Sequence, residues 1–335
     1  MNSEDLSTLS KGYVEAKVLL CAAELRVFDH LADEPAAAEE VAHKVGGTLR
    51  GFEILLDALT SLGVLHKHEG RYRLDPACRE DLLSDGSTRM ADLLRHRNRL
   101  FRRWAFLEEI IRGGELPAAV DGPGLLADPV ATDDFIRAMF AVSGGRAGQV
   151  ASALDLDGVR VIADLGGGPG HYLVALLERA PKARGYLADL PPSLQVARAL
   201  LADHPLRKRI ELVAWDLYRG EPANPIDPID LAFISQVLHG CGPEPNREML
   251  RRVAAHLAPG GRVVIHENVV EEDRCHPRQA ALFAVNMLAM TDQGRTYTDA
   301  EISAWGKEAG LAREGGQRID ERSYLIVLRR PRLEP

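Results

Sequence analysis

The sequence predicts an α/β protein in which a mainly helical N-terminal domain precedes a doubly wound, mostly parallel sheet. Two observations support this prediction. From residue 159 onward, short apolar runs typical of buried strands alternate with helical stretches, which is the order of elements in a parallel sheet. Before residue 159, apolar residues recur at steps of three and four, interrupted by one small hairpin. A chain of 335 residues is long enough for two domains.

The N-terminal residues have the order of a winged helix, in which helices precede a small hairpin. Helices are expected over residues 12–32, 36–45 and 48–62, and strands over 64–66 and 72–74. The helix that would enter a DNA groove carries Glu53 and Asp57, whose charges repel phosphate. We therefore expect a packing module here and not a DNA reader.

The composition limits which partners and compartments fit the chain. Lys and Arg number 41 and Asp and Glu 49, and the net charge of −8 disfavours nucleic-acid binding. No apolar run reaches the ~18 residues of a membrane span, and residues 1–11 lack the hydrophobic stretch of a signal peptide. Cys21, Cys78, Cys241 and Cys275 are scattered, as suits a reducing compartment. These features predict a cytoplasmic protein without membrane or nucleic-acid partners.

The remaining elements follow along the chain. We expect a long helix over residues 89–112, a connection over 113–129 and a helix over 133–154. Parallel strands are expected at 159–164, 184–189, 210–214, 229–235 and 262–266, and a closing antiparallel pair at 312–318 and 323–329. The corresponding domains are an N-terminal domain over 1–112, connecting helices over 113–150 and the sheet domain over 151–335. Ligands of such sheets bind beyond the carboxyl ends of the strands.

A glycine-rich turn follows the first of these strands, in residues 164–170 (Asp-Leu-Gly-Gly-Gly-Pro-Gly). Gly166, Gly168 and Gly170 let the backbone pass close under a ligand, and the helix that follows offers unpaired N–H groups. A dinucleotide fold has the spacing G-x-G-x-x-G, and here the third glycine comes one residue early. Three glycines can also simply form a tight turn, so the turn alone leaves the ligand open.

Two further acidic residues support a nucleotide-like ligand at this turn. Asp189 ends the second strand, about twenty residues after the turn, where an acid can accept from both ribose hydroxyls of a nucleoside. Asp216 ends the third strand, where it can accept from an adenine amino group while Leu217 flanks the ring. With Asp164 after the first strand, acids follow three successive strands. This pattern indicates a nucleoside-containing cofactor rather than three helix caps.

Several motifs together resemble one enzyme family. They are residues 164–170, 189–191 (Asp-Leu-Pro), 215–217 (Trp-Asp-Leu), 237–239 (Val-Leu-His), 257–261 (Leu-Ala-Pro-Gly-Gly) and 286–288 (Asn-Met-Leu). The chain resembles, over nearly its whole length, the S-adenosylmethionine (SAM)-dependent O-methyltransferases of plants and bacteria, which include caffeate and acetylserotonin methyltransferases. The resemblance implies a class I SAM-methyltransferase domain with a Rossmann-like sheet, an N-terminal winged-helix domain that forms a homodimer, and SAM as methyl donor.

The same resemblance implies which residues form the site. SAM contacts are expected along the glycine turn and at Met139, Ser143, Asp189, Leu190, Asp216, Leu217 and Ser235. In the family the histidine of the Leu-His pair, here His239, is the general base, and an acid at the end of the fifth strand, here Glu267, orients its imidazole. Alignment of acceptor, methyl and sulfur can contribute up to ~7–11 kcal/mol, and a general base roughly 10²–10⁴-fold.

The chain departs from the family around this base. The family usually continues His-Asp-Trp, whereas here glycine and Cys241 follow the histidine, and Thr296 or a neighbour stands where a second acid is common. Ser235 replaces a frequent Lys or Arg, and His266 occupies a strand position that is usually aliphatic. The base assignment is kept, but we expect a substrate environment unlike that of the plant phenol enzymes.

These departures leave a rival chemistry open. His239, Cys241 and His266 are donors of the kind that bind zinc or iron. A metal there would stabilise the enolate in C-methylation of a 2-oxo acid, with Arg295 pairing the carboxylate. Because neighbouring strand residues point to opposite faces, His266 and Glu267 cannot both face the pocket without a bulge or a strand end.

The leading hypothesis is a homodimeric SAM-dependent methyltransferase that acts, without a metal, on a hydroxyl of a small secondary metabolite. Metal-assisted C-methylation is the first alternative. A winged-helix regulator that only senses SAM is the second, and the acidic charge disfavours it.

Overall fold

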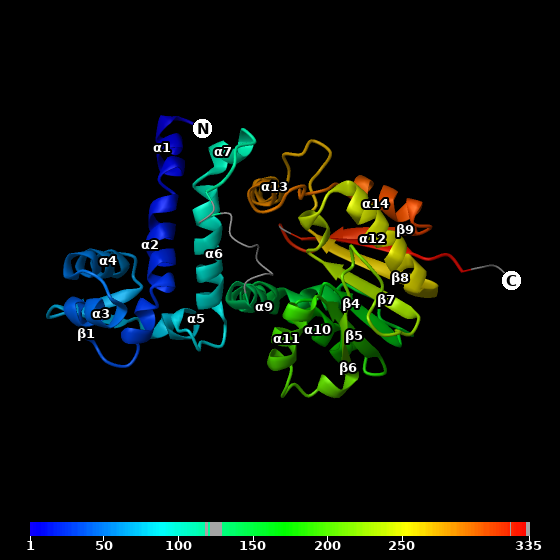
Figure 1. Ribbon diagram of the computed structural model, residues 1–335, viewed down its shortest axis with the longest axis horizontal. Coiled ribbons are helices and arrows are strands. Elements are labelled where there is room, and N and C mark those ends of the chain that lie inside the picture. The colour runs from blue at the N-terminus through cyan, green and yellow to red at the C-terminus, as the bar shows by residue number, and fades with distance from the viewer. Residues whose placement is uncertain (118–119, 121–128, 322, 333–335) are drawn as a thin grey trace. The chain divides into compact units, whose positions relative to one another are not determined.

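The computed structural model describes residues 1–117, 120, 129–321 and 323–332. The chain forms two compact units (Figure 1). The first comprises residues 1–102 and 137–142, and the second residues 103–136 and 143–335. Each unit has its own hydrophobic core.

The first unit combines helices with one small sheet. Its helices are α1 (Ser3–Ser10), α2 (Tyr13–Glu24), α3 (Ala38–Val45), α4 (Leu49–Ser61), α5 (Arg79–Leu82) and most of α6 (Met90–Trp104). The sheet has the antiparallel order β1-β3-β2, with β1 (Ala36–Ala37), β2 (Leu65–His68) and β3 (Arg71–Leu74). Phe28, Leu56 and Leu59 are buried in its core. The predicted helix over 48–62 and the hairpin after it are confirmed.

Local capping and backbone geometry set the helix ends in this unit. The Thr48 hydroxyl accepts from the backbone N–H of Gly51 at 3.2 Å and so begins α4. The prediction of one helix over 12–32 is wrong, because α2 ends at Glu24 and Arg26 takes a left-handed backbone with φ of 52°. A 3-10 turn, η1 (Val27–His30), follows.

A seven-stranded sheet with the order β6-β5-β4-β7-β8-β10-β9 forms the centre of the second unit (Figure 1). Its strands are β4 (Val161–Leu165), β5 (Arg184–Asp189), β6 (Ile210–Ala214), β7 (Ile229–Ser235), β8 (Leu257–Glu267), β9 (Ala312–Arg318) and β10 (Tyr324–Arg329). Strands β4 to β8 pair in parallel, and β10 joins β8 and β9 antiparallel. The predicted α/β class with a Rossmann-like sheet is confirmed, although β8 begins earlier than expected.

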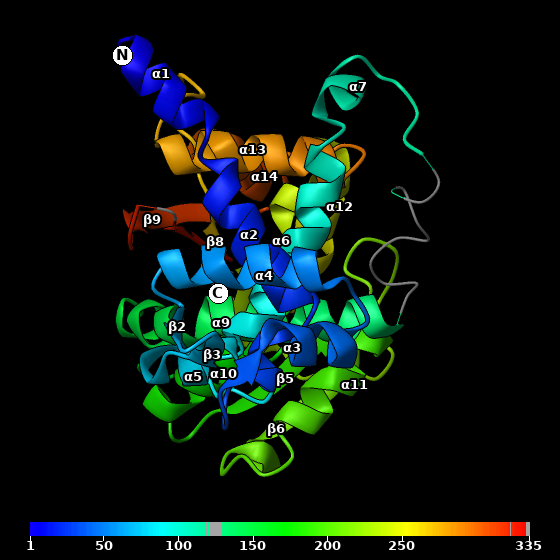
Figure 2. The ribbon, with the colours of Figure 1, turned by 90° about the vertical axis from the view of Figure 1, so that its left-hand side faces the viewer.

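Helices cover both faces of this sheet (Figure 2). Residues of α9 (Pro129–Ser152), α10 (His171–Arg179) and α11 (Pro191–Leu200) pack on one face, and residues of α12 (Pro243–His256) and α14 (Asp299–Glu308) on the other. The predicted helix over 89–112 is divided by a turn at residues 105–106 into α6 and α7 (Leu107–Ile111), and α7 contacts α13 (Arg278–Met290). In the described part of the chain, we find no helix with both the length and the apolar character needed to cross a membrane.

Candidate active site

The glycine turn between β4 and α10 is shaped by backbone conformation and by lack of space. Three of its glycines have left-handed backbones that strain other residues, with φ of 71° at Gly166, 51° at Gly168 and 86° at Gly170. At Gly167 a Cβ would lie 2.4 Å from Cδ1 of Leu187 and 2.6 Å from Cγ of Asp164. At Gly167 the turn therefore passes too close to β4 and β5 to hold a side chain.

Two carboxylates support this turn. Asp164 is fully buried and accepts from the backbone N–H of Leu173 at 3.2 Å; burial raises its pKa to about 7, against the effect of that hydrogen bond. Asp189 is half-buried and accepts from the backbone N–H groups of Gly168 at 2.8 Å and Leu190 at 2.7 Å. Burial also raises the pKa of Asp189, while those two hydrogen bonds lower it. Each Asp189 oxygen keeps a further lone pair with which to accept from a ligand hydroxyl.

The strand order places the predicted nucleoside contacts along one edge of the sheet. Because β4, β5 and β6 are neighbours, Asp164, Asp189 and Asp216 follow one another at the carboxyl ends of adjacent strands. Asp216 is half-buried and accepts from a backbone N–H two residues further on, at 3.0 Å. Leu217 is buried, and its Cδ1 lies 3.9 Å from the position that a Cβ at Gly166 would take. The arrangement fits a nucleoside whose base lies near β6 and whose ribose lies near β5.

Two predicted SAM contacts lie on α9. Met139 belongs to the first unit, in residues 137–142. The backbone of Ser143 is helical, but its side chain lies outside the described residues. Contacts of Met139 and Ser143 with SAM stay predictions.

The structure brings His239 and Glu267 together beyond β7 and β8. His239 lies in the 3-10 turn η4 (Leu238–Gly240), and its Nδ1 is 2.8 Å from Oε2 of Glu267. The other carboxylate oxygen of Glu267 accepts from the backbone N–H of Leu238, also at 2.8 Å. Burial alone would raise the pKa of Glu267, but the charge and hydrogen bond of His239 outweigh it and lower that pKa. An ionised Glu267 thus fixes the imidazole by Nδ1 and leaves Nε2 for an acceptor.

His266 points away from this pair. It is register partner of Ser235 in the parallel strands, and its Nδ1 lies 2.8 Å from Oγ of Ser235. Alternation along β8 therefore sends His266 to one face and Glu267 to the other. The metal set of His239, Cys241 and His266 is wrong as a constellation, because one member lies on the opposite face of the sheet.

Arg295 belonged to the metal alternative, and Thr296 stands where a second acid is common in the family. Arg295 is exposed and Thr296 is buried. Among the residues that the structure describes, ligand atoms close enough for one metal ion belong to exposed Glu271, Asp273 and His276. This group is on the surface and includes none of the predicted donors.

Sequence reasoning missed three residues around the base. The Phe283 ring of α13 stands edge-on to the His239 imidazole, with centroids 4.8 Å apart. Gln236 has a left-handed backbone with φ of 58°, and its N–H donates to the carbonyl of His266 at 2.9 Å. The Asn268 amide donates to the Gln236 side chain, which joins the ends of β7 and β8 below the base. Nothing local in the sequence marks these contacts, because each joins segments far apart in the chain.

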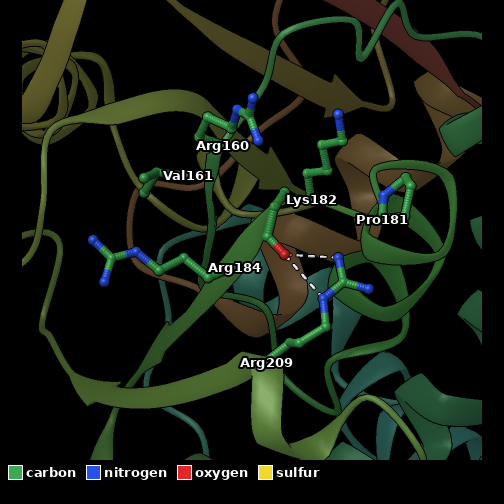
Figure 3. Close-up of a pocket in the computed structure, with 7 residues that line it drawn as sticks. Arg160, Val161, Pro181, Lys182, Arg184 and Arg209 are labelled. Atoms are coloured by element: carbon green, nitrogen blue, oxygen red, sulfur yellow. Dashed lines mark hydrogen bonds between the residues drawn. The ribbon is translucent and has the colours of Figure 1, made fainter.

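A hollow of about 490 Å³ lies at the amino-terminal ends of the strands, opposite the glycine turn (Figure 3). Arg160, Lys182, Arg184 and Arg209 line it. Arg209 donates to the Ala183 carbonyl at 2.7 and 2.9 Å, and Arg184 is paired with an aspartate. The hollow is thus separated from the glycine turn by the length of the strands and takes no part in the candidate site.

Two family models match the chain. An O-methyltransferase domain matches residues 125–312, and an O-methyltransferase dimerisation domain matches residues 7–84. The tetracenomycin polyketide synthesis 8-O-methyl transferase TcmO of Streptomyces glaucescens is 31% identical over 98% of this chain and 97% of its own. The 3-hydroxy-5-methyl-1-naphthoate 3-O-methyltransferase of Streptomyces sahachiroi is 33% identical over 92% of this chain and 89% of its own.

Solved structures of the same kind superpose on the whole chain. The structure of PigF with SAH has a TM-score of 0.86 at 26% identity and covers 98% of this chain and 100% of that one. The structure of the mitomycin 7-O-methyltransferase MmcR has a TM-score of 0.83 at 28% identity and covers 98% and 97%.

Proposed function

This chain belongs to the SAM-dependent O-methyltransferase family, and on that premise we propose that it methylates a hydroxyl of a small secondary metabolite with His239 as general base. The observation that carries the proposal is the His239–Glu267 pair. The two side chains are 2.8 Å apart and lie at the carboxyl ends of β7 and β8. The predicted SAM contacts lie at the carboxyl ends of the strands next to β7, from β4 to β6.

The residues present at the turn fit SAM as the methyl donor. The glycines of the turn have no side chains that would stand between its backbone and a ligand, and Asp189 offers lone pairs where a ribose would lie. When bound, SAM supplies an electrophilic methyl group on a positively charged sulfur. The enzyme itself has to hold acceptor oxygen, methyl carbon and sulfur in line and to take up the acceptor's proton.

His239 performs the proton transfer in this proposal. Its Nε2 would take the acceptor's hydroxyl proton, and SAM, when bound, would supply the methyl group for that oxygen. Glu267 accepts from Nδ1–H, so it fixes the tautomer whose Nε2 is a base and stabilises the imidazolium that forms. The Phe283 ring holds the imidazole plane from the side.

The similar enzymes support the class of acceptor. By their names, these relatives are O-methyltransferases of tetracenomycin polyketide, naphthoate and mitomycin synthesis. Similarity over nearly the full chain supports a hydroxyl of a small molecule of that kind as acceptor here.

A homodimer through the first unit is part of the proposal. The dimerisation-domain match over residues 7–84 supports it. Several large apolar side chains of this unit are exposed on α1 and α2, namely Leu6, Leu9, Tyr13 and Val14. Covering them on a second copy would remove their apolar surface from water.

Methyl transfer from SAM carrying a ¹³C-labelled methyl group tests the function. We expect release of SAH and a labelled methyl group on oxygen, identified by NMR, with an acceptor found among hydroxylated aromatic metabolites. His239→Gln should bind SAM as the wild type does and lose turnover by roughly 10²–10⁴-fold. A label found on carbon, or full activity in His239→Gln, would contradict the proposal.

A further inference from the structure

The turn over residues 238–241, here called the base turn, carries His239 and is held by hydrogen bonds from other segments. Gly240 lies inside it, and the position that a Cβ would take there is open space. Because glycine has more backbone freedom than any other residue, the base turn needs contacts from outside to keep one conformation. The position of His239 therefore depends on what the backbone groups of this turn contact.

Asn246 contacts the base turn from the first turn of α12, where it is 0% exposed. Its Nδ2 donates to the carbonyl of Leu238 at 2.9 Å and to the carbonyl of Cys241 at 3.3 Å. The Tyr297 hydroxyl also donates to the Cys241 carbonyl. Leu238 comes directly before His239 in the chain, and Cys241 follows two residues after it. The amide of Asn246 thus links both ends of the segment that contains the base.

The polar atoms of the Asn246 amide match their partners. A carbonyl can only accept, so the two carbonyls of the base turn require that the amide nitrogen face them. The amide oxygen then faces Tyr218, whose hydroxyl donates to Oδ1 at 2.9 Å and lies 3.3 Å from the Val237 carbonyl. Burial raises the pKa of Tyr218, so its hydroxyl keeps the proton that it donates. An apolar side chain of similar size at position 246 would give up all three bonds of the amide.

Asn246 and Glu267 hold the same residue by opposite backbone groups. Oε1 of Glu267 accepts from the Leu238 N–H at 2.8 Å, and Asn246 donates to the Leu238 carbonyl. The peptide units on both sides of Leu238 are therefore fixed, and a rotation of either one would break one of these bonds. The other oxygen of Glu267 lies 2.8 Å from Nδ1 of His239. Asn246 and Glu267 together thus fix both the backbone before the base and its imidazole.

We propose that Asn246 is a positioning residue, which holds the base turn so that His239 keeps its contact with Glu267 and presents Nε2 to the acceptor. Tyr218 supports Asn246 by donating to its amide oxygen. In this role Asn246 affects turnover, and it affects the binding of SAM and acceptor little. The inference rests on the proposed function of His239 as general base.

Proton NMR of the SAH-bound protein tests the position of the base without an acceptor. An Nδ1–H that donates to a carboxylate and is shielded from water gives a resonance downfield of the amides, and its loss in His239→Gln assigns it. We expect Asn246→Leu to lose this resonance or broaden it by exchange. Tyr218→Phe leaves both donor bonds of Asn246 in place, so it should show faster exchange and retain the resonance.

Kinetics at saturating SAM, with the hydroxylated aromatic acceptor that the labelling assay identifies, give the second readout. Asn246→Leu should lower kcat by about tenfold or more, the combined effect of losing two hydrogen bonds between neutral groups. The KM for acceptor and the calorimetric affinity for SAM should stay those of the wild type. Tyr218→Phe should lower kcat less, and it still tests the proposal if Asn246→Leu does not fold.

Val253→Ala is the matched control for stability. Val253 is buried on the same helix two turns further on, so its truncation weakens the packing of α12 while every bond of Asn246 remains. This variant should unfold more easily and keep both the resonance and the wild-type kcat.

Several outcomes would overturn the proposal. They are a wild-type protein without the downfield resonance, an Asn246→Leu variant with wild-type resonance and kcat, or a Val253→Ala variant with the same losses as Asn246→Leu. If Asn246→Leu does not fold, wild-type exchange of the resonance in Tyr218→Phe would overturn it as well. Failure of the proposed function would be seen differently, since the resonance would still depend on Asn246 while no hydroxyl became methylated.

Discussion

Replacing Glu267 by Gln removes one charge beside the base without changing the shape of the side chain. We expect this substitution to lower kcat while SAM affinity stays that of the wild type. In the wild type, Oε2 accepts from Nδ1–H of His239 and Oε1 from the Leu238 N–H, both at 2.8 Å. The two partners are both donors, so the site requires an acceptor at each position.

A glutamine cannot meet that requirement. If its oxygen faces Leu238, its NH₂ group faces His239 and favours the tautomer with the proton on Nε2, which cannot act as a base. If its oxygen faces His239, the NH₂ group meets the Leu238 N–H and leaves buried donors unpaired. The lost interaction is a charge-assisted hydrogen bond worth about 1.5–3 kcal/mol, which corresponds to a decrease in kcat of about 10–150-fold.

The assay is SAH release under saturating SAM, together with calorimetric SAM binding. Glu267→Asp is the control, since it keeps the charge on a shorter side chain and should retain more activity than Glu267→Gln. The wild-type Glu267 has a lowered pKa in the folded state, so its ionised form stabilises the fold above the ordinary carboxyl pKa, and this stabilisation is lost as pH falls through the folded value. The glutamine variant should lack this acid-side dependence. Wild-type kcat in Glu267→Gln would refute the orienting role of this carboxylate.

Three other substitutions test the cofactor edge. Asp189→Ala should weaken SAM binding by at least about tenfold in calorimetry, because an acceptor for the ribose hydroxyls is lost; unchanged affinity would contradict that role. Gly167→Ala should reduce stability by about 1–3 kcal/mol in urea unfolding, because its Cβ would lie 2.4 Å from Leu187; a fully stable variant would mean that the turn can relax. Asp164 has a folded pKa of about 7 against an ordinary value of 3.8, so the folded state binds more protons between these values and loses stability as pH rises through them. Asp164→Asn should remove this loss when unfolding at about pH 5 and about pH 8 is compared, and an identical pH dependence in both proteins would refute it.

The strands of the sheet could be predicted from sequence because their signal is local. Strands β5, β6 and β7 have the predicted bounds, since each is a mainly apolar run, and β5 and β7 end at a polar residue. Helix breaks were not predictable in the same way. The left-handed Arg26 and the turn at 105–106 interrupt segments whose apolar periodicity continues across the break. Tertiary packing determines where these two helices end, and the apolar periodicity of the sequence carries no information about that packing.

In the candidate site, too, some residues could be predicted from the sequence and others depend on tertiary contacts. The family resemblance predicted His239 and Glu267 after the fourth and fifth strands, and neighbouring parallel strands bring their carboxyl ends together. The Phe283 contact and the Gln236–Asn268 bond depend on how α13 and the loop after β8 fold back. No local sequence pattern predicts how α13 and the loop after β8 pack against the base. The pairing of Ser235 with His266 could be anticipated only once the register of β7 and β8 was known.

That register gives the end of β8 two separate tasks. His266 and Glu267 are adjacent in sequence, and alternation directs the first to Ser235 and the second to His239. A shift of one residue would exchange them, placing a carboxylate in the aromatic surroundings of Phe233 and an imidazole opposite the base. Burying that carboxylate without a partner would be strongly unfavourable. The His266–Ser235 and Glu267–His239 contacts therefore favour the observed register of β7 and β8. A histidine in place of an aliphatic residue at position 266 does not disturb the base, because its side chain lies on the opposite face of the sheet from His239.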